Sequence, residues 1–271
     1  MIMTLVKSGN YDPVWTELRE EVADMAKSEN MLASYLHATV LNHKSLEHSL
    51  SFLLAGRLTS PYLSAMSLRD VIDESFYADA EIGAAVRRDL TAIVERDPAA
   101  LGMAQPFLYY KGFHALEAYR VSHWLWNKKR NALALHLQNR ISEVFAVDIH
   151  PAARIGKGIL IDHATSVLIG ETAVVGDDVS MLHEVTLGGN GKESGDRHPK
   201  VGNGVLIGAG AKILGNIKIG DDSKIAAGSV VLKEVPPHST VAGIPARVVG
   251  QPITVVPSHV MDQNFDFDYC I

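Results

Sequence analysis

Residues 201–231 read VGNGVLIGAGAKILGNIKIGDDSKIAAGSVV, and in this stretch every sixth residue is Val or Ile. The six anchors are Val201, Ile207, Ile213, Ile219, Ile225 and Val231. In a chain with 47% hydrophobic residues, six apolar anchors in one fixed frame would arise by chance about once in a hundred trials. A six-residue period fits neither a helix nor a simple strand, but it is typical of a solenoid whose coils contain three short strands. The stretch therefore predicts a parallel β-helix with one continuous core.

The same period extends toward the N-terminus, with two irregularities. The earlier anchors are Ile149, Ile155, Ile161, Ile169, Val175, Met181 and Leu187. After Ile161 the register slips by two residues, directly behind Asp162-His163, and such a slip predicts a bulge that redirects nearby side chains. Residues 188–200, GGNGKESGDRHPK, cannot join a coil and are expected to project as a loop. Such a loop is either a binding element on a rigid scaffold or a solvated excursion without a role.

The first half of the chain has a helical period instead. Its clearest apolar sets are Trp15, Leu18, Val22 and Met25; Leu32, Leu36 and Val40; and Leu68, Val71, Ile72 and Phe76. Asp97-Pro98 is typical of a helix start, with an N-cap followed by proline. We expect an all-helical domain over 1–145, a β-helix over 146–250 and a flexible tail over 251–271. This is an α+β chain with its helices and strands segregated.

Composition limits the function classes. The chain of 271 residues carries a formal net charge of −6 and one cysteine, Cys270. An acidic chain lacks the basic face that phosphate recognition needs, so we expect no nucleic-acid partner. One cysteine permits no internal disulfide, and no stretch approaches the roughly 18 apolar residues of a membrane span. We expect a cytoplasmic protein without a membrane partner.

Short motifs accompany the repeats and the helical half. They are VDIHPAA (147–153), IDHAT (161–165), GETAV (170–174), VTLGG (185–189), GDRHPK (195–200) and GIPAR (243–247), with MLAS (31–34), RDPA (96–99) and KGFHAL (111–116) before them. Together they closely resemble the bacterial serine O-acetyltransferases, which are hexapeptide-repeat acyltransferases with a left-handed β-helix. The resemblance covers the chain up to about Gly250. The repeats alone indicate an acyltransferase-like solenoid, whereas the HisProAla, AspHisAla and AspArgHisPro segments are much more specific.

The resemblance implies transfer of an acetyl group from acetyl-CoA to the hydroxyl of L-serine, the first step of cysteine biosynthesis. A serine hydroxyl is a weak nucleophile at neutral pH, so its attack needs a base such as histidine. By resemblance His163 is this general base, and Asp148 orients and stabilises its imidazole. Their separation of 15 residues is close to one coil of about 18 less a corner, which is compatible with neighbouring coils. We expect direct attack without an acyl-enzyme, because the chain has no Gly-x-Ser-x-Gly motif.

Binding of zwitterionic serine requires acidic groups at its ammonium and donors at its carboxylate. By resemblance Asp97 and Asp162 take the ammonium, while Arg197 and His198 take the carboxylate. A guanidinium suits this role because it can donate two parallel hydrogen bonds to a carboxylate. The alternatives are a helix cap for Asp97 and a contribution to solubility for Arg197.

Coenzyme A is expected to lie in the groove between adjacent solenoids, as in hexapeptide acyltransferases. The resemblance places Gly188, Ala209 and Ala227 along it, with Arg247 or Lys224 on the phosphates. For the small residues the alternative is a steric role in tight turns.

The resemblance also implies partners. We expect a homotrimer, with the helical halves pairing two trimers into a hexamer. L-cysteine is the expected inhibitor at the serine site. The C-terminal Ile271 is expected to dock on O-acetylserine sulfhydrylase, since a backbone nest can capture a terminal carboxylate. Acetyl-CoA is the expected co-substrate, and no metal is expected.

Two other functions stay open on the sequence. An acetyltransferase of this fold can act on a sugar or antibiotic hydroxyl, although the long helical half and the Asp97 segment count against it. A solenoid of the γ-carbonic anhydrase type would hold zinc with three histidines, for which His150, His163, His183 and His198 are available. No three-histidine pattern recurs at coil spacing.

Overall fold

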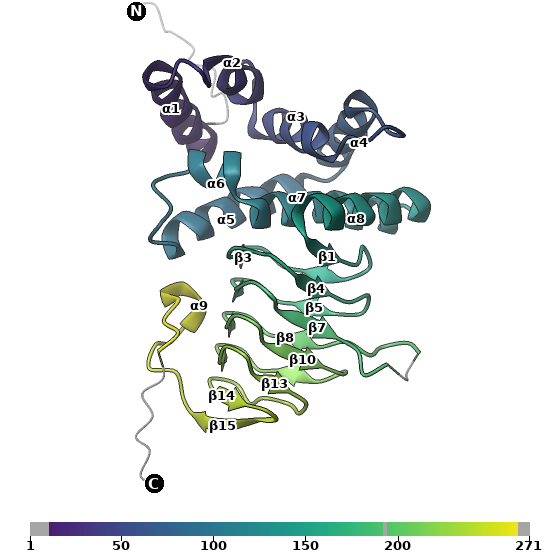
Figure 1. Cartoon of the computed structure of the whole chain (residues 1–271), viewed down its shortest axis with the longest axis vertical. Coiled ribbons are helices and arrows are strands. Elements are labelled where there is room, and N and C mark those ends of the chain that lie inside the picture. The colour runs from purple at the N-terminus through teal and green to yellow at the C-terminus, as the bar shows by residue number, and fades with distance from the viewer. Residues whose placement is uncertain (1–10, 192–193, 265–271) are drawn as a thin grey trace, which may run out of the picture.

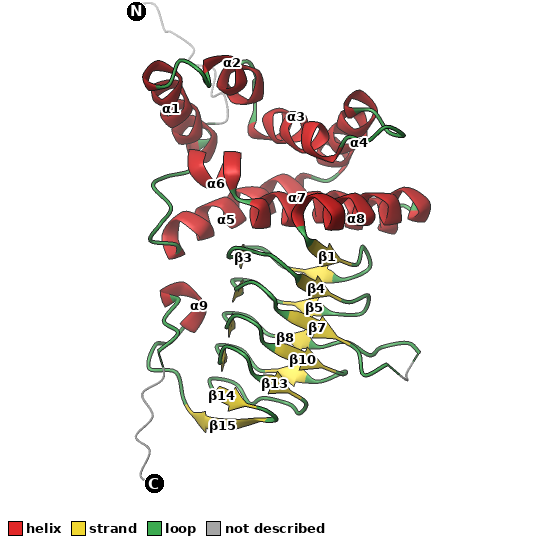
Figure 2. Cartoon of the chain, viewed as in Figure 1, coloured by secondary structure: helices red, strands yellow, loops and turns green. Residues whose placement is uncertain are grey.

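Two stacked parts make up the molecule, a helical part and a β-solenoid, as Figure 1 shows. The structure is a computed structural model that describes residues 11–191 and 194–264. Helices and strands are segregated as the sequence predicts (Figure 2). The last helix of the helical part ends at Phe145 and the first strand begins at Val147, with Ala146 between them in the left-handed conformation.

The helical part is built from amphipathic helices around α7. The elements are α1 (Pro13–Ser28), α2 (Ala33–Leu36), the π-helical turn η1 (His37–Leu41), α3 (Leu46–Leu58), α4 (Ala65–Ala78), α5 (Ala80–Arg96), α6 (Ala104–Tyr109), α7 (Lys111–Asn127) and α8 (Asn131–Phe145). The apolar spacing predicts the buried faces of α1 and α4, which include Leu18 and Ile72. Asp97 ends α5 and does not begin a helix, because α6 starts at Ala104. Its carboxylate instead accepts the Ala99 amide at 2.9 Å, which closes a turn.

The solenoid consists of short strands in three sheets, which are parallel except for β15, and its hexapeptide repeats fit a left-handed β-helix. The strands are β1 (Val147–Ile149), β2 (Arg154–Ile155), β3 (Leu160–Ile161), β4 (Val167–Ile169), β5 (Val174–Val175), β6 (Ser180–Met181), β7 (Thr186–Gly188), β8 (Lys200–Val201), β9 (Leu206–Ile207), β10 (Lys212–Leu214), β11 (Lys218–Ile219), β12 (Lys224–Ile225), β13 (Val230–Val231), β14 (Thr240–Gly243) and β15 (Ala246–Gly250). Sheet A has the order β1-β4-β7-β10-β13, sheet B β11-β8-β5-β2 and sheet C β15-β14-β12-β9-β6-β3. The predicted anchors fill the core, and all except Ile155 are buried.

Three edges run along the solenoid where its sheets meet. The His163 edge joins sheets C and A and contains residues 162–166, 182–185, 208–211 and 226–229. The Arg197 edge joins sheets A and B and contains residues 150–153, 170–173, 189–191 and 194–199. The Asp178 edge joins sheets B and C and contains residues 156–159, 176–179, 202–205 and 220–223.

Both irregularities of the repeat lie at edges. The slip widens the first corner of the His163 edge, where His163, Ala164 and Ser166 all have positive φ. Across this corner Leu160 pairs with Ser180, a spacing of 20 residues, whereas Leu206 pairs with Lys224, a spacing of 18. The predicted loop projects from the Arg197 edge between β7 and β8. Its first and last predicted residues, Gly188 and Lys200, belong to those strands.

The segment after Gly250 differs from the expected flexible tail as far as Asn264. It turns back along the solenoid and forms α9 (Pro257–Val260), which lies beside the upper coils in Figure 1. Ser258 is buried, and its hydroxyl donates to the Asp178 carbonyl at 2.6 Å. Its own carbonyl accepts the Ser180 hydroxyl at 2.9 Å. These contacts fix the segment because buried backbone groups need hydrogen-bond partners.

Buried charges join the helical part to the first coil. The Arg120 guanidinium pairs with Asp89, whose second carboxylate oxygen accepts the Ile159 amide at 2.8 Å. Glu117 lies in the same cluster and is fully buried. Burial, and next the Asp89 carboxylate, raise the pKa of Glu117 well above its usual range. Burial also raises the pKa of Asp89, so the guanidinium faces two carboxyl groups, and the shift toward the neutral form is larger for Glu117.

Candidate active site

The predicted base lies at the widened corner of the His163 edge. The His163 side chain is 74% exposed, and its Nε2 atom lies 3.9 Å from Oδ2 of Asp162. A cavity of about 340 Å³ opens beside it, and its lining includes Asp97, Tyr110 and Gly112. The structure therefore brings three of the predicted residues together at one mouth, namely Asp97, Asp162 and His163.

The charges in this cavity interact. Burial, and then the Asp97 charge, raise the pKa of Asp162, while His163 opposes the shift. Burial and the carboxylates of Asp97 and Asp162 raise the pKa of Tyr110 to about 12. The cavity is thus acidic, as a site for an ammonium group must be, and the Tyr110 phenol remains protonated.

Helix α7 approaches this corner very closely. A Cβ atom added at Gly112 would lie 2.1 Å from the Ile161 carbonyl oxygen, so the close approach requires glycine. The preceding residue, Lys111, donates to the Thr165 hydroxyl at 2.5 Å. The start of α7 therefore fixes the corner that carries the base.

Arg197 and His198 lie together at the Arg197 edge. The Arg197 guanidinium donates to Glu171 at 2.7 Å, which lowers the pKa of that carboxyl. Nδ1 of His198 accepts the Thr172 amide at 3.1 Å, so Nε2 carries the proton in the neutral ring. Burial, followed by Arg197 and Lys200, lowers the pKa of His198. Space for the ring comes from Gly170, where an added Cβ would lie 2.1 Å from it.

Asp148 is the middle residue of β1, between the buried Val147 and Ile149. Its Oδ1 atom accepts the Gln138 side-chain amide at 2.7 Å. Among the residues that the structure describes, Asp148 and His163 share no hydrogen bond. The expected orienting contact is therefore not formed within this one chain.

The predicted serine-binding residues occupy two different edges of the solenoid. Sheet A lies between the edges, and its strands of three residues span roughly 10 Å. Asp97, Asp162 and His163 stand on one side, whereas Arg197 and His198 stand on the other. One chain thus presents two halves of the predicted site.

The predicted CoA residues follow the same division. Ala209 and Ala227 occupy equivalent positions on adjacent coils of the His163 edge, where the Gly228 amide donates to the Ala209 carbonyl at 2.8 Å. Gly188 ends β7 at the Arg197 edge. Arg247 is exposed on β15.

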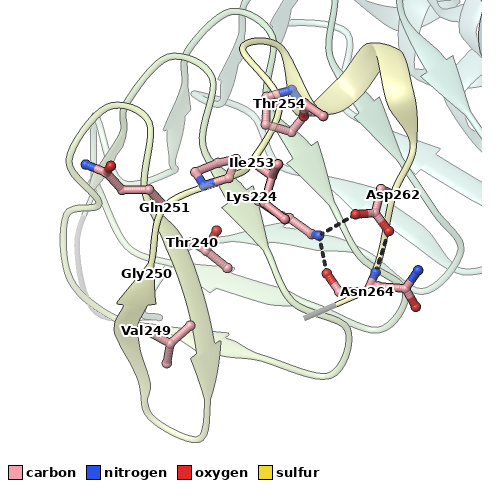
Figure 3. A pocket seen from close by; sticks show the side chains of 11 residues that line it. Lys224, Thr240, Val249, Gly250, Gln251, Ile253, Thr254, Asp262 and Asn264 are labelled. Atoms are coloured by element: carbon pink, nitrogen blue, oxygen red, sulfur yellow. Dashed lines mark hydrogen bonds and ion pairs between the residues drawn. The ribbon is translucent and has the colours of Figure 1, made fainter. Parts of the chain in front are cut away.

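Lys224 has a different environment from the one expected of a phosphate ligand. Its side chain is only 8% exposed and lies under the segment after Gly250, as Figure 3 shows. The ammonium group donates to the Asn264 carbonyl at 2.6 Å and lies 3.8 Å from the Asp262 carboxylate. These contacts hold Lys224 within the protein, so Arg247 is the better phosphate candidate of the two.

Sequence reasoning gave no role to several residues that complete these edges. Glu171 and Thr172 hold Arg197 and His198, and Gln138 holds Asp148. Glu171 and Thr172 belong to the GETAV motif, which could have indicated their role, whereas Gln138 lies on α8 in no recognisable motif.

Ile271 falls outside the described residues. Within the part of the chain that is described, no group of three or more His, Cys, Asp or Glu could hold a metal. None of the helices there is long and apolar enough to cross a bilayer.

Comparison with known proteins identifies the family. The family described as "Serine acetyltransferase, N-terminal" matches residues 14–118, and the bacterial transferase hexapeptide repeats match residues 198–233. A serine acetyltransferase of Salmonella typhimurium is 56% identical over 253 residues, which cover 93% of each chain. The crystal structure of the Vibrio cholerae serine acetyltransferase has a TM-score of 0.93 at 57% identity, covering 94% of this chain and 98% of that one. The soybean enzyme complexed with serine has a TM-score of 0.86 at 57% identity, covering 87% and 97%. With this likeness over both halves of the molecule, the chain belongs to the serine acetyltransferase family.

Proposed function

We propose that this protein transfers the acetyl group of acetyl-CoA to the hydroxyl of L-serine by direct attack, with His163 as the general base. The observation that carries the proposal is the acidic cavity beside His163, in a chain of the serine acetyltransferase family. His163 is exposed at its mouth, so substrate can reach the imidazole. The reaction begins the path from serine to cysteine.

The reaction needs two proton transfers, one from the substrate to His163 and one from His163 to the leaving group. The His163 imidazole takes the proton of the serine hydroxyl as the oxygen attacks the thioester carbon. The tetrahedral intermediate then collapses, the carbon–sulfur bond breaks, and the CoA thiolate receives the proton from His163. Asp148 is the carboxylate that we assign to orient the ring, since a fixed tautomer keeps the accepting nitrogen toward the substrate.

Serine recognition divides between the two edges. Asp97 and Asp162 pair with the ammonium group in the acidic cavity. Arg197 and the protonated Nε2 of His198 donate to the carboxylate. Glu171 holds the guanidinium in position. Cysteine has the same two charged groups, and a solved relative is in complex with cysteine, which supports inhibition at this site.

A second copy of the chain completes the site. Because the two edges face different sides of one solenoid, the His163 edge of one subunit must meet the Arg197 edge of the next. Repeated around a three-fold axis, this heterologous contact closes as a homotrimer with three shared sites. CoA then lies between Ala209 and Ala227 of one subunit and Gly188 of its neighbour, with its phosphates at Arg247. A Brucella abortus relative solved with coenzyme A supports this co-substrate.

Three further assignments belong to this proposal. The helical parts pair two trimers into a hexamer. Ile271 docks on O-acetylserine sulfhydrylase. The protein works in the cytoplasm, where its co-substrate acetyl-CoA is made and used.

The test follows thiol release from acetyl-CoA with L-serine as acceptor, in the presence and absence of L-cysteine. We expect serine-dependent release that cysteine suppresses and that His163→Ala abolishes. His238→Ala is the matched control, because His238 also occupies a left-handed turn of the solenoid, with φ of 51° against 55° for His163. Full activity of His163→Ala would remove it as the base. Release with a sugar hydroxyl but not with serine would contradict the serine assignment.

A further inference from the structure

Tyr110 lines the cavity beside His163, and the proposed mechanism and serine contacts give it no role. It is the residue between α6 and α7, with an extended backbone. Its amide donates to the Pro106 carbonyl, and its own carbonyl accepts the His114 amide, both at 3.1 Å. These backbone contacts hold Tyr110 at the wall of the cavity.

Asp97 is a carboxylate of the same cavity, and its charge is not used by a cation of the chain. Its amide donates to the Ile93 carbonyl at 2.8 Å, and its carboxylate accepts the Ala99 amide at 2.9 Å. Among the described residues Asp97 forms no ion pair, because the ammonium group of Lys111, which also lines the cavity, donates to Thr165. The charge of Asp97 is therefore available to a cationic ligand.

The Tyr110 phenol interacts with this carboxylate. Burial, followed by the Asp97 charge and a hydrogen bond to its side chain, raises the pKa of Tyr110 to about 12, so the phenol stays protonated at neutral pH. A donated hydrogen bond stabilises an ionised carboxylate and limits its rotation. An arginine or lysine would do the same, but its positive charge would compete with the ammonium group of serine. A neutral donor therefore suits a carboxylate that must bind a cation.

We propose that Tyr110 is a positioning residue for serine recognition, whose hydroxyl donates to Asp97 and keeps that carboxylate ionised and directed at the ammonium group of the substrate. The proposal rests on the proposed role of Asp97. Tyr110 makes and breaks no covalent bond and moves no proton. Its effect is therefore on the affinity for serine and cysteine and not on acetyl transfer.

The test begins with wild type and Asp97→Asn, assayed by thiol release from acetyl-CoA. An unchanged KM for L-serine in Asp97→Asn would remove the proposed role of Asp97 and, with it, that of Tyr110. Tyr110→Phe keeps the ring and loses the hydroxyl. It should raise the KM for L-serine about tenfold, as for loss of a hydrogen bond to a charged group, with kcat and the KM for acetyl-CoA within about twofold. Tyr77→Phe, which removes a phenol that is 95% exposed on α4, is the control and should change none of these constants.

A double-mutant cycle separates the positioning of Asp97 from a general effect on the cavity. Asp97→Asn removes the charge that the phenol stabilises, so adding Tyr110→Phe in this background should change the KM for L-serine by less than about twofold. A further rise as large as that in the wild-type background overturns the proposal, because Tyr110 would then act independently of Asp97. So does a normal KM in Tyr110→Phe together with a raised KM in Tyr110→Leu, since the ring itself would then contact the ammonium group.

Inhibitors test the same contact without turnover. L-cysteine carries an ammonium group, and 3-mercaptopropionate is the same molecule without it. Tyr110→Phe should raise the inhibition constant of L-cysteine by about the same factor as the KM for L-serine and leave that of 3-mercaptopropionate at the wild-type value. Equal shifts for the two thiols would contradict an effect of the hydroxyl at the ammonium group.

Discussion

Asp162 is partly buried beside a second carboxylate, which favours its neutral form. Its proposed role, binding an ammonium group, requires the ionised form. Burial and Asp97 raise its pKa, so part of the free energy of serine binding depends on keeping it ionised. Asp97 also supplies a second negative charge for the ammonium group of serine. The pair Asp97 and Asp162 therefore gains affinity at neutral pH at the expense of affinity in acid.

This arrangement predicts the pH dependence of serine binding. As pH falls through the raised pKa of Asp162, the carboxylate is protonated and affinity for L-serine is lost at a higher pH than for an ordinary aspartate. Asp97→Asn removes the second charge, so the loss should move to lower pH even if binding is weaker throughout. Calorimetric titration with L-serine between about pH 4 and about pH 8 measures both curves. Coincident midpoints would show that Asp97 does not act on Asp162.

Residues in the repeat were predictable, but their partners were not. The slip after Ile161 predicted an unusual corner at His163 because a shift in period must be absorbed locally. Contacts such as Gln138 with Asp148 join segments of different period, and no local pattern encodes them. The turn at Asp97 was misread because Asp-Pro is compatible with both a helix start and a turn after a helix.

Among the elements, α7 sets the geometry of the corner through Gly112. Gly112→Ala places a methyl group against the Ile161 carbonyl, so we expect a loss of about 1 to 3 kcal/mol of unfolding free energy. Because the same corner carries Asp162 and His163, kcat should fall by about tenfold or more. Urea denaturation and steady-state kinetics measure the two effects.

Gly56→Ala in α3 is the matched control for this substitution. No atom lies within 4 Å of an added Cβ at Gly56, and alanine favours the helix over glycine. It should raise stability by about 0.5 to 1 kcal/mol and leave kcat unchanged. Equal effects of the two substitutions would contradict a specific role for the approach of α7.

The buried cluster between α5, α7 and the first coil gives a prediction for stability. Arg120→Met leaves the Asp89 charge without its guanidinium and should cost about 3 to 5 kcal/mol. Glu117→Gln replaces a carboxyl whose raised pKa favours the neutral form, and it should change stability by about 1 kcal/mol or less.

The pH dependence of Glu117→Gln checks the proton assignment. The folded pKa of Glu117 exceeds its unfolded value, so wild type is most favoured at low pH and loses stability as pH rises toward the folded pKa. Glutamine does not titrate. Its stability relative to wild type should increase between about pH 5 and about pH 8, as measured by urea denaturation. A constant difference would mean that Glu117 is ionised in the fold.

For the whole molecule, the division of the site between edges predicts complementation. His163→Ala and Arg197→Ala each inactivate a different edge, so a contact between two intact edges can still form in a mixed trimer. Random mixing of equal amounts should restore about a quarter of the wild-type activity, since each edge is intact in half of the subunits. Co-expression with two affinity tags isolates the mixed trimers, in which one of the three contacts joins two intact edges, so their activity should be about a third of wild type. A mixture no more active than its parents would place both edges of each site in one subunit.

The segregated architecture was readable from the sequence because period is a property of each segment alone. The return of residues 251–264 along the solenoid was not, since this segment has no period and its position depends on contacts with Asp178, Ser180 and Lys224. Sequence separation between these partners reaches 80 residues. Such long-range contacts arise from the three-dimensional surface that the coils create.

That return has a consequence for cooperativity. In a repeat protein each coil contacts its immediate neighbours, so the stack behaves as a one-dimensional chain whose terminal repeat can fray independently. The segment around α9 links the coil of Asp178, the coil of Lys224 and helix α5 in one connected set. Opening the terminal coil therefore disturbs contacts with coils further up the stack, so the returning segment couples coils that are not neighbours and favours melting of the solenoid as a unit.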